Sequence, residues 1–447
     1  MSRKLQKVLL VYPEIPTNTY WSFKYALKFI KKKSAMPPLG LITIAALLPK
    51  TTEIKLIDMN IELLKEEDIQ WADAVFISAM GVQKQSFKIV VERCNQLDKP
   101  IVAGGPYITV SHAEISNVGH FILGEAEEIL PTFLEDFEQG IAKPLYASSS
   151  RPDITHTVLP RFDLLSIKAY ASMSIQYSRG CPFNCEFCDV WQIYGRAPRI
   201  KSAENMIAEL NALDQLGWRG ALFVVDDNFI GNKPHVKNHL LPAFTQWQKM
   251  RQYPYRFYTE ASVNLAEDDE LLSNMKKAGF NSVFLGIETP SEKSLQETGK
   301  LQNIKSSMID AIKKIQSYSI EVMGGFIVGF DSDDETIFDR QINFIQKTAI
   351  PKAMVGLLHA VPGTTLYARL KKENRILTDI FSGSNTHALE TNFIPKMDPK
   401  VLKNGYGRLL DFLYGQRLKN YFKRCNQLLD NLGDSSLFQR DIHLAEI

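Results

Sequence analysis

Short runs of apolar residues recur along most of the chain, and stretches with helical periodicity separate them. A strand that is apolar along its whole length is buried on both faces, which is typical of a parallel sheet with helices on each side. Strands that alternate with helices in this way predict the α/β class. The 447 residues are enough for about three domains of ~150 residues each.

The first part of the chain predicts one doubly wound parallel sheet. Its expected strands are residues 7–13, 53–59, 74–80, 100–106 and 120–126. Ligands bind such sheets at the carboxyl ends of the strands, where this chain has Met80-Gly81 and Gly104-Gly105. Glycines there either form tight turns or let a ligand approach the backbone closely. We predict a domain over residues 1–140 and, because proline and serine replace periodicity, a linker over 141–172.

A second series of apolar runs predicts six strand–helix units. Its expected strands are residues 173–179, 220–227, 255–262, 282–289, 321–330 and 353–361. Units of ~30 to 40 residues fit a partial or complete parallel barrel over residues 173–362, with its chemistry at the C-terminal ends of the strands. Ser202 is the expected N-cap of a helix over 202–217. Residues 363–447 are helical and basic, and we favour packing on the core over a cover for the barrel mouth or contact with a membrane surface.

Charge and hydropathy exclude several classes of protein. The net charge of +2 indicates neither a nucleic-acid partner nor an acidic one. No run of ~18 apolar residues is present, so we expect no transmembrane helix. The N-terminus lacks the features of a signal peptide, which makes the cytoplasm the expected location. Thiols stay reduced there, so we do not expect a disulfide framework.

Three of the five cysteines lie within eight positions, as Cys181, Cys185 and Cys188. A structural zinc site needs four protein ligands, and no histidine stands at a ligand spacing from this loop. A redox pair of Cys185 and Cys188 leaves Cys181 without a role. An iron–sulfur cluster usually takes four thiolates. Three thiolates leave one iron open, and an open metal position is typical of a catalytic site.

The spacing C-x3-C-x2-C, with Phe187 before the last cysteine and a strand before the first, resembles the radical S-adenosylmethionine (SAM) superfamily. The resemblance implies that the three cysteines hold a 4Fe-4S cluster, and that the open iron binds SAM, whose carbon–sulfur bond is cleaved reductively. The segment "GGFIVGFD" resembles the family's glycine-rich strand near the adenine, with Gly325 and Gly329 at the matching places. In "FLGIETP", Glu288 stands where the family has a glutamate near the SAM ribose.

Further polar residues follow the second and third strands of this series. Asp226, Asp227 and Asn228 replace the Gly-Gly-Glu turn that meets the SAM amino group in many family members. Glu260 and Ser262 end the third strand and are expected to face the same site. Acidic side chains in loops also cap helices and form salt bridges, which is the role we expect for Asp331 and Asp334. For Glu260 and Glu288 we favour the site, as candidate catalytic residues.

A flavodoxin-like domain before such a barrel resembles the cobalamin-binding subclass of radical SAM enzymes. Residues 36–49, 103–109 and 124–131 stand where that subclass has its signature segments, and the helical tail resembles the branch that includes hopanoid methylases and many members of unknown activity. The Asp-x-His-x-x-Gly motif of cobalamin mutases is absent. Cobalamin therefore binds without a histidine ligand, or the domain has lost it. The candidate contacts are Met80, Gly81, Gly104, Gly105 and Tyr107.

The resemblance implies a cobalamin-dependent methyltransferase acting on an unactivated carbon of a small-molecule or lipid substrate. An electron donor such as flavodoxin or ferredoxin would reduce the cluster. One alternative is a radical SAM 3-amino-3-carboxypropyl transferase of the arsinothricin-biosynthesis type, with a degenerate cobalamin domain. Another is a non-catalytic cobalamin or redox sensor. Nothing in the sequence indicates a nucleic-acid partner, and peripheral contact with a membrane remains compatible with the basic tail.

Overall fold

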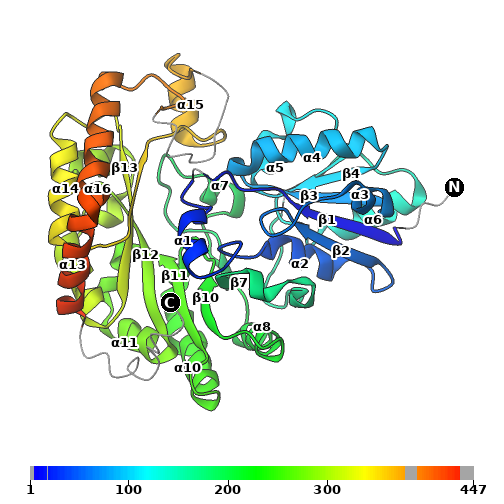
Figure 1. Cartoon of the computed structure of the whole chain (residues 1–447), viewed down its shortest axis with the longest axis horizontal. Helices are drawn as coiled ribbons and strands as arrows, with labels where there is room; N and C mark the ends of the chain where they lie inside the picture. The colour runs from blue at the N-terminus through cyan, green and yellow to red at the C-terminus, as the bar shows by residue number, and fades with distance from the viewer. Residues whose placement is uncertain (1–4, 18, 149, 378–389, 433–447) are drawn as a thin grey trace. The chain divides into compact units, whose positions relative to one another are not determined.

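The computed structural model describes residues 5–17, 19–148, 150–377 and 390–432. The chain forms two compact units. The first contains the described residues up to Ile175, together with Arg199–Trp218. The second contains Gln176–Pro198 and the described residues from Arg219 onward. Each unit is built around strands of a parallel sheet, as the sequence predicts, and the elements carry the labels of Figure 1.

The first unit contains a six-stranded parallel sheet with the order β2-β1-β3-β4-β5-β6. Its elements are β1 (Lys7–Tyr12), α1 (Lys24–Phe29), α2 (Leu39–Leu47), β2 (Glu53–Asp58), α3 (Glu66–Trp71), β3 (Ala74–Ser78), α4 (Lys84–Gln96), β4 (Ile101–Gly104), α5 (Pro106–Ser111), β5 (His120–Leu123), α6 (Ile129–Gln139), β6 (Leu145–Ala147), β7 (Ser172–Ile175), β9 (Arg199–Ile200) and α8 (Ala203–Gln215). The five predicted strands are confirmed. Strand β6 lies in the predicted linker, where three residues between polar segments give no detectable pattern.

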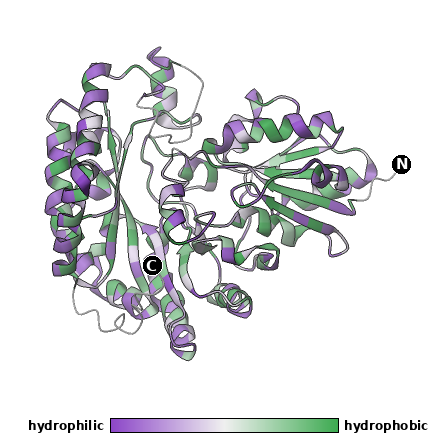
Figure 2. Cartoon of the chain, viewed as in Figure 1, coloured by the Kyte–Doolittle hydropathy of each residue, from purple (hydrophilic) through white to green (hydrophobic). Residues whose placement is uncertain are grey.

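Alternate residues of the first sheet belong to two different cores. Leu9 and Val11 pack with Phe87 of α4, whereas Val8 and Leu10 pack with the opposite helices α2 and α6. Burial on both faces explains why the strands read as continuous apolar runs. Figure 2 shows the hydrophobic strands and the hydrophilic outer faces of the helices.

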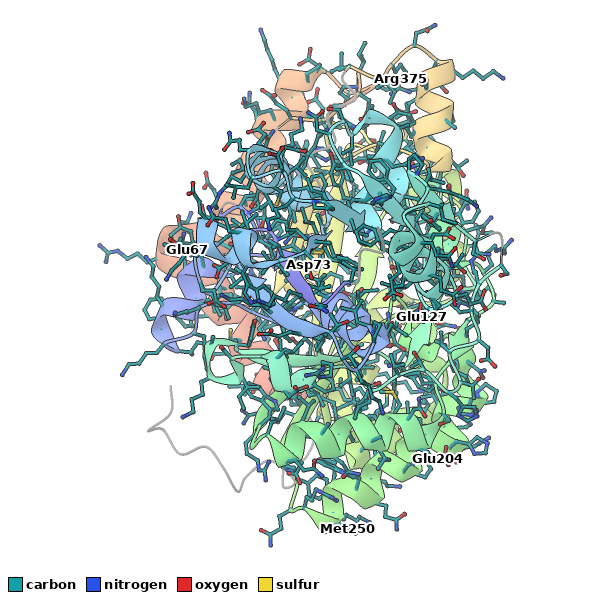
Figure 3. All side chains as sticks on the ribbon, turned by 90° about the vertical axis from the view of Figure 1, so that its right-hand side faces the viewer. Glu67, Asp73, Glu127, Glu204, Met250 and Arg375 are labelled. Carbon is teal, nitrogen blue, oxygen red and sulfur yellow. The ribbon has the colours of Figure 1, made fainter. Side chains whose placement is uncertain are left out.

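Polar contacts fix the ends of the first strands. The carboxylate of Asp73, labelled in Figure 3, accepts hydrogen bonds from the backbone N–H groups of Gln6 (2.9 Å) and Lys7 (2.8 Å), and so fixes the start of β1. At the other end, Tyr170 donates to the buried carboxylate of Asp58 (3.0 Å). The end of the predicted linker is thereby attached to the sheet.

Helix α8 belongs to the first unit, although we predicted it as part of the barrel domain. Ser202 is its N-cap, as predicted, and accepts a hydrogen bond from the backbone of Asn205 (3.1 Å). The Asn205 side chain donates to the carbonyl of Thr157 (2.9 Å), and the Ser202 N–H donates to that of Thr155 (3.1 Å). These bonds to the linker explain why α8 groups with the first unit.

The second unit contains strands β10 to β14, which pair in the order β14-β13-β12-β11-β10. Its elements are β8 (Ser178–Arg179), α7 (Val190–Tyr194), β10 (Gly220–Val224), α9 (Lys233–His235), α10 (Leu241–Met250), β11 (Tyr255–Ala261), α11 (Asp269–Ala278), β12 (Phe280–Glu288), α12 (Glu292–Glu297), α13 (Met308–Ser317), β13 (Glu321–Val328), α14 (Ile337–Lys347), β14 (Ala353–Leu357), α15 (Thr365–Lys372) and α16 (Pro399–Asn431). All six predicted strands of this series are present.

One face of this sheet is fully buried and the other is partly open. On β11, Phe257 and Thr259 are buried, whereas Tyr258 and Glu260 on the opposite face are half-buried. The same alternation runs along β12 and β13. Since side chains of a strand alternate between faces, the half-buried set forms one continuous inner face.

The C-terminal region packs on the helical layer of the second unit. Helix α16 contacts α14, α13 and β13 and lies beside them in Figure 1, which agrees with the favoured packing on the core. Its backbone leaves helical geometry between Gly415 and Leu418, so α16 consists of two helical parts. None of the helices in the described ranges is long and apolar enough to cross a membrane.

Arg424 generates the first prediction. Its side chain is fully buried and donates to the carbonyls of Ile350 (2.8 Å) and Leu413 (3.2 Å), and so joins both parts of α16 to the loop before β14. Arg424→Met leaves these buried carbonyls without donors, and should lower the free energy of unfolding by about 3 kcal/mol in urea titrations. Arg408→Met removes an exposed arginine of the same helix and should change it by less than about 1 kcal/mol. Equal losses in the two variants would contradict this role for Arg424.

Candidate functional site

The three cysteines lie on a loop that folds back on itself. Cys181 donates its N–H to the carbonyl of Gly195 (3.1 Å), and Cys188 donates to the carbonyl of Cys185 (3.2 Å). Gly180 has a φ of +96°, and a β-carbon there would lie 2.8 Å from the Gly195 oxygen. Only glycine therefore lets the chain enter this loop from β8.

Two side-chain amides point at the thiols from other parts of the unit. The Asn228 amide lies 4.0 Å from the sulfur of Cys181, and the Gln302 amide lies 3.8 Å from the sulfur of Cys185. Burial raises the pKa of the Cys181 and Cys188 thiols. A bound cation favours the thiolate form, and amide hydrogen bonds to sulfur adjust the potential of an iron–sulfur cluster.

The donor set fits a cluster better than a single ion. Among the described residues, no three histidine, cysteine or carboxylate side chains converge closely enough to hold one metal ion. In a cubane cluster each cysteine binds a different iron, so the three sulfurs stand further apart than the ligands of one ion. Phe187 lies between the second and third cysteines. Its ring packs against that of Phe330, with the two ring centroids 6.0 Å apart, and covers the loop. Three thiols, two amide donors and this cover fit a 4Fe-4S cluster with one open iron.

Asp226, two residues after the end of β10, bonds to the residues that lead into the cysteine loop. Its carboxylate accepts hydrogen bonds from the backbone N–H of Tyr177 (2.8 Å) and the hydroxyl of Ser178 (2.6 Å), which lead into the cysteine loop. We predicted a cofactor contact for Asp226, and the structure instead bonds both carboxylate oxygens to the protein. Asn228 accepts from the backbone of Ser262 (3.3 Å), so β10 and β11 meet beside Cys181.

The carboxyl groups of Asp227 and Glu260 are both affected by burial and by neighbouring carboxylates. Burial, together with the charges of Asp226 and Asp189, raises the pKa of Asp227 to about 7. Burial and the charges of Asp227, Asp226 and Glu288 raise the pKa of Glu260 to about 8. The described residues provide no salt-bridge partner for either carboxyl group. A cationic ligand would relieve the cost of ionising both.

Glu288 ends β12 beside a lysine that sequence reasoning missed. It has a φ of +63°, next to a register shift in the strand, and its carboxylate forms a buried ion pair with Lys300. A β-carbon on Gly286 would lie 2.7 Å from both the Glu288 oxygen and the Lys300 nitrogen. The pair therefore occupies the space that this glycine leaves. No motif marked Lys300, because its partner lies on another element.

The two predicted adenine-side glycines have packing roles that the structure explains. A β-carbon on Gly325 would lie 2.8 Å from the Phe284 ring. Gly329 has a φ of +101°, and its N–H donates to the carboxylate of Asp333 (2.9 Å). Gly325 leaves room for the Phe284 ring within β13, and Gly329 makes the turn that follows the strand.

The expected structural roles of two loop aspartates are confirmed. Asp331 forms ion pairs with Arg375 (2.6 Å) and Arg369 (2.9 Å). Asp334 accepts a hydrogen bond from the backbone of Thr336 (2.9 Å). Neither carboxylate is free to act on a substrate.

The carboxyl edge of the first sheet has the backbone geometry of a ligand cradle. Gly105 has a φ of +95°, and a β-carbon there would lie 2.6 Å from the Ser78 hydroxyl. Gly124 has a φ of +78° and open space around its missing β-carbon. Gly104 ends β4 beside them. Gly105 thus allows close packing against Ser78, whereas the open space beside Gly124 is compatible with the approach of a ligand.

The remaining first-unit candidates divide into backbone and core positions. Met80 donates its N–H to the Gln83 side chain (2.8 Å), and Gly81 opens a short 3-10 helix. Tyr107 is only 3% exposed and packs against Phe87, so its ring belongs to the core and only its backbone lies at the strand edge. A contact between Tyr107 and the cofactor stays a prediction, for which its backbone is the accessible part.

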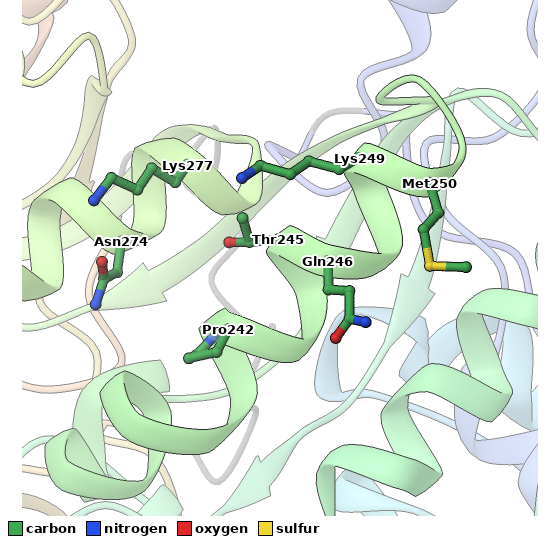
Figure 4. A pocket seen from close by; sticks show the side chains of 7 residues that line it. All are labelled: Pro242, Thr245, Gln246, Lys249, Met250, Asn274 and Lys277. Carbon is green, nitrogen blue, oxygen red and sulfur yellow. The ribbon is translucent and has the colours of Figure 1, made fainter.

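A surface pocket of about 430 Å³ lies between α10 and α11 (Figure 4). Its lining residues are Pro242, Thr245, Gln246, Lys249, Met250, Asn274 and Lys277. They belong to helices rather than to strand ends, and Met250 is 71% exposed. The pocket has no connection to the cysteine loop and no cluster of reactive groups.

Three protein-family models match the sequence. The radical SAM superfamily matches residues 175–340, the B12 binding domain matches residues 29–134, and a domain of unknown function (DUF4070) matches residues 364–446. The models therefore cover the cysteine loop, strands β2 to β5 of the first sheet, and helices α15 and α16, respectively.

Two relatives cover most of the chain. An uncharacterized methyltransferase of Synechocystis sp. is 43% identical over 424 residues, which are 94% of this chain and 78% of the relative. The hopanoid C-2 methylase of Rhodopseudomonas palustris is 34% identical over 389 residues, 86% of this chain and 73% of the relative. The structure of the cobalamin-dependent SAM radical enzyme OxsB, with aqua-cobalamin and SAM bound, has a TM-score of 0.69 at 16% identity and covers 92% of this chain and 67% of its own. This last similarity shows a shared fold.

The Glu288–Lys300 pair generates the second prediction. Removing one partner of a buried ion pair leaves an uncompensated charge. Lys300→Met should therefore lower the free energy of unfolding by about 3 to 5 kcal/mol, measured with urea on anaerobic protein. The double variant Lys300→Met/Glu288→Gln should recover part of this loss. A double variant that is less stable than Lys300→Met would show that the charge of Glu288 is not the cause.

Glu260 generates the third prediction. Its pKa rises from the ordinary 4.5 to about 8 in the folded chain, so between these values the folded state keeps a proton that the unfolded state has released. The free energy of unfolding of the cofactor-free protein should therefore fall as the pH rises from 5 to 8. In Glu260→Gln this fall should be smaller, and the variant should be more stable than the wild type above pH 8. Glu292→Gln, at an exposed position of α12, should follow the wild type, and an unchanged slope in Glu260→Gln would contradict the assignment.

Proposed function

Because this chain belongs to the cobalamin-binding branch of the radical SAM superfamily, together with hopanoid C-2 methylase, we propose that it methylates an unactivated carbon of an apolar small molecule or lipid. The observation that carries the proposal is the three-thiol loop together with Asp227 and Glu260, whose pKa values are raised by burial and by neighbouring carboxylates and which have no salt-bridge partner among the described residues. SAM carries two positive groups at neutral pH, its sulfonium and its amino group. We therefore assign the three-thiol loop to the cluster whose open iron binds SAM, and the two carboxyl groups to the positive groups of SAM.

The cofactors of this branch supply the chemistry when bound: a 4Fe-4S cluster the electron, SAM the radical source and the methyl group, and cobalamin the methyl carrier. Cys181, Cys185 and Cys188 hold the cluster. Asp227 and Glu260 bind the positive groups of SAM.

Other residues orient these groups. Asp226, Asn228 and Ser262 fix the loop against β10 and β11 through the hydrogen bonds described above. The ends of β12 and β13, with Glu288, Gly325 and Gly329, form the side on which the nucleoside lies. In the first unit, the backbone at Met80-Gly81 and Gly104-Gly105 contacts cobalamin.

The inner face of the second sheet supports an apolar substrate. Phe223 and Tyr258 stack there with ring centroids 4.6 Å apart and an interplanar angle of 1°. Phe284, Met323 and Met354 lie half-buried along the same face. An apolar face also limits water near a reactive intermediate. The hopanoid methylase among the relatives points in the same direction.

Reduction of the cluster requires an external electron donor, and a flavodoxin or ferredoxin fits this task. The aminocarboxypropyl transferase and the sensor are not favoured, because the relatives named above are a methyltransferase and a methylase. Product analysis separates these functions directly.

The test is anaerobic reconstitution with iron, sulfide and cobalamin, followed by SAM and dithionite. We expect bound cobalamin and the products 5′-deoxyadenosine and S-adenosylhomocysteine once an apolar acceptor is supplied. Formation of 5′-methylthioadenosine without cobalamin binding would exclude methyl transfer and favour aminocarboxypropyl transfer. A fully loaded cluster with no SAM cleavage would favour the sensor.

The cluster ligands generate the fourth prediction. Cys188→Ala should lose the cluster absorption and reduce SAM cleavage by at least ~100-fold, because two thiolates do not replace three. Cys425→Ala removes a half-buried thiol of α16 outside the loop and should retain both. Iron per chain, measured with the cleavage rate, checks this. Retention of a full cluster by Cys188→Ala would exclude it as a ligand.

A further inference from the structure

The middle of the cysteine loop is bonded to residues far along the chain. Glu186 and Phe187 stand between Cys185 and Cys188. The N–H of Glu186 donates to the carbonyl of Thr298 (2.9 Å), and its own carbonyl accepts from the N–H of Leu366 (2.9 Å). The first turn of α15 is therefore attached directly to the loop.

Arg369, one turn further along α15, binds the side chain of the same residue. Its Nε and Nη2 donate to the two carboxylate oxygens of Glu186, with an Nη2–Oε2 distance of 3.3 Å. Its Nη1 donates to Asp331 (2.9 Å), at the exit of β13. A bidentate arginine–carboxylate pair fixes the relative orientation of the two side chains as well as the distance between them.

A second arginine holds this arrangement in place. Arg375 donates to both carboxylate oxygens of Asp331, at 2.6 Å and 2.8 Å, and Figure 3 labels it. Burial raises the pKa of Asp331, but hydrogen bonds from Arg375 and Arg369 lower it below the ordinary value overall. The side chains of Glu186 and Asp331 are 11% and 7% exposed, so these charges are screened little by water.

Phe187 is enclosed by the same region. It packs with a cluster of buried apolar residues that includes Leu366 and Leu370 of α15 and Phe393. On its other side, the Lys300 nitrogen lies 5.7 Å from its ring. Both residues between Cys185 and Cys188 are thus fixed, one by charge and one by packing.

We propose that α15 is a clamp on the cluster loop, with Arg369 as its positioning residue. The clamp consists of Leu366, Arg369 and Leu370. It keeps the spacing of the three cysteines, so that the open iron stays accessible to SAM. This assigns a role to the beginning of the region that matches a domain of unknown function, and it rests on the proposed function in requiring a cluster.

The chain offers a matched control for an arginine in the same region. Arg408 of α16 pairs with Asp339 of α14 at 3.3 Å, and both side chains are more than half exposed, at 57% and 61%. Exposed pairs of this kind contribute little. Arg408→Gln changes the same charge without touching the loop.

The experiment compares reconstituted wild type, Arg369→Gln, Arg369→Lys, Glu186→Gln and Arg408→Gln under anaerobic conditions. The readouts are the rate of iron release to a chelator and the change in the EPR spectrum of the reduced cluster on adding SAM. Arg369→Gln and Glu186→Gln should release iron roughly five- to tenfold faster and show an altered SAM-dependent signal. Arg369→Lys should lie between them and the wild type, and Arg408→Gln should match the wild type.

Each result decides the proposal. Wild-type release rates and spectra in both Arg369→Gln and Glu186→Gln would overturn it, as would equal effects in Arg408→Gln. If Arg369→Gln does not fold, Glu186→Gln decides alone, because it leaves the Arg369–Asp331–Arg375 contacts in place. A wild type that loads no cluster would overturn the clamp together with the proposed function. A wild type that loads the cluster but transfers no methyl group would overturn the proposed function alone.

Discussion

The carboxyl ends of β10, β11 and β12 meet at one edge of a parallel sheet, and the chemistry of the site depends on this geometry. Residues 226–228, 260–262 and 288 are far apart in sequence, yet each follows a strand that runs in the same direction. Four acidic side chains, Asp226, Asp227, Glu260 and Glu288, are therefore brought close together, and burial makes their mutual repulsion costly. Among the described residues, Glu288 pairs with Lys300, whereas Asp227 and Glu260 have no salt-bridge partner. The cost of ionising these two carboxyl groups and the attraction of a cation to them therefore have the same origin.

How much of this the sequence predicts depends on the range of the interaction. The strands, the Ser202 cap and the three-cysteine loop follow from local patterns, and all are present. The separate roles of Asp226 and Asp227 do not follow, because neighbouring residues at a strand end point in different directions and only one of them reaches Tyr177 and Ser178. Lys300 was missed because its partner lies on another element. The burial of the Tyr107 ring does not follow either, because the packing of α5 against α4 involves residues far apart in sequence. The strand β6 was missed because three residues carry too little pattern.

The two sheets illustrate two uses of one architecture. In the first unit both faces are buried by helices, and the carboxyl edge of the sheet carries glycines, of which Gly124 has open space beside it. In the second unit the helices cover one face, and the inner face keeps half-buried aromatic side chains such as Tyr258. A sheet edge with glycines in place of side chains suits a large cofactor that is bound mainly by shape complementarity. A sheet face that carries aromatic side chains suits a substrate that must be oriented and shielded from water.

The contact between Glu186 and Arg369 also has a consequence in time. The two residues are 183 positions apart, so the cysteines leave the ribosome long before α15 does. At about 5 to 20 residues per second, the interval is on the order of 10 to 40 seconds. During this interval the Glu186 carboxylate lacks its arginine partner, although the loop and the residues before it already have partners in Gly195 and Asp226. The last quarter of the chain therefore completes the surroundings of a loop that is made before the middle of the chain.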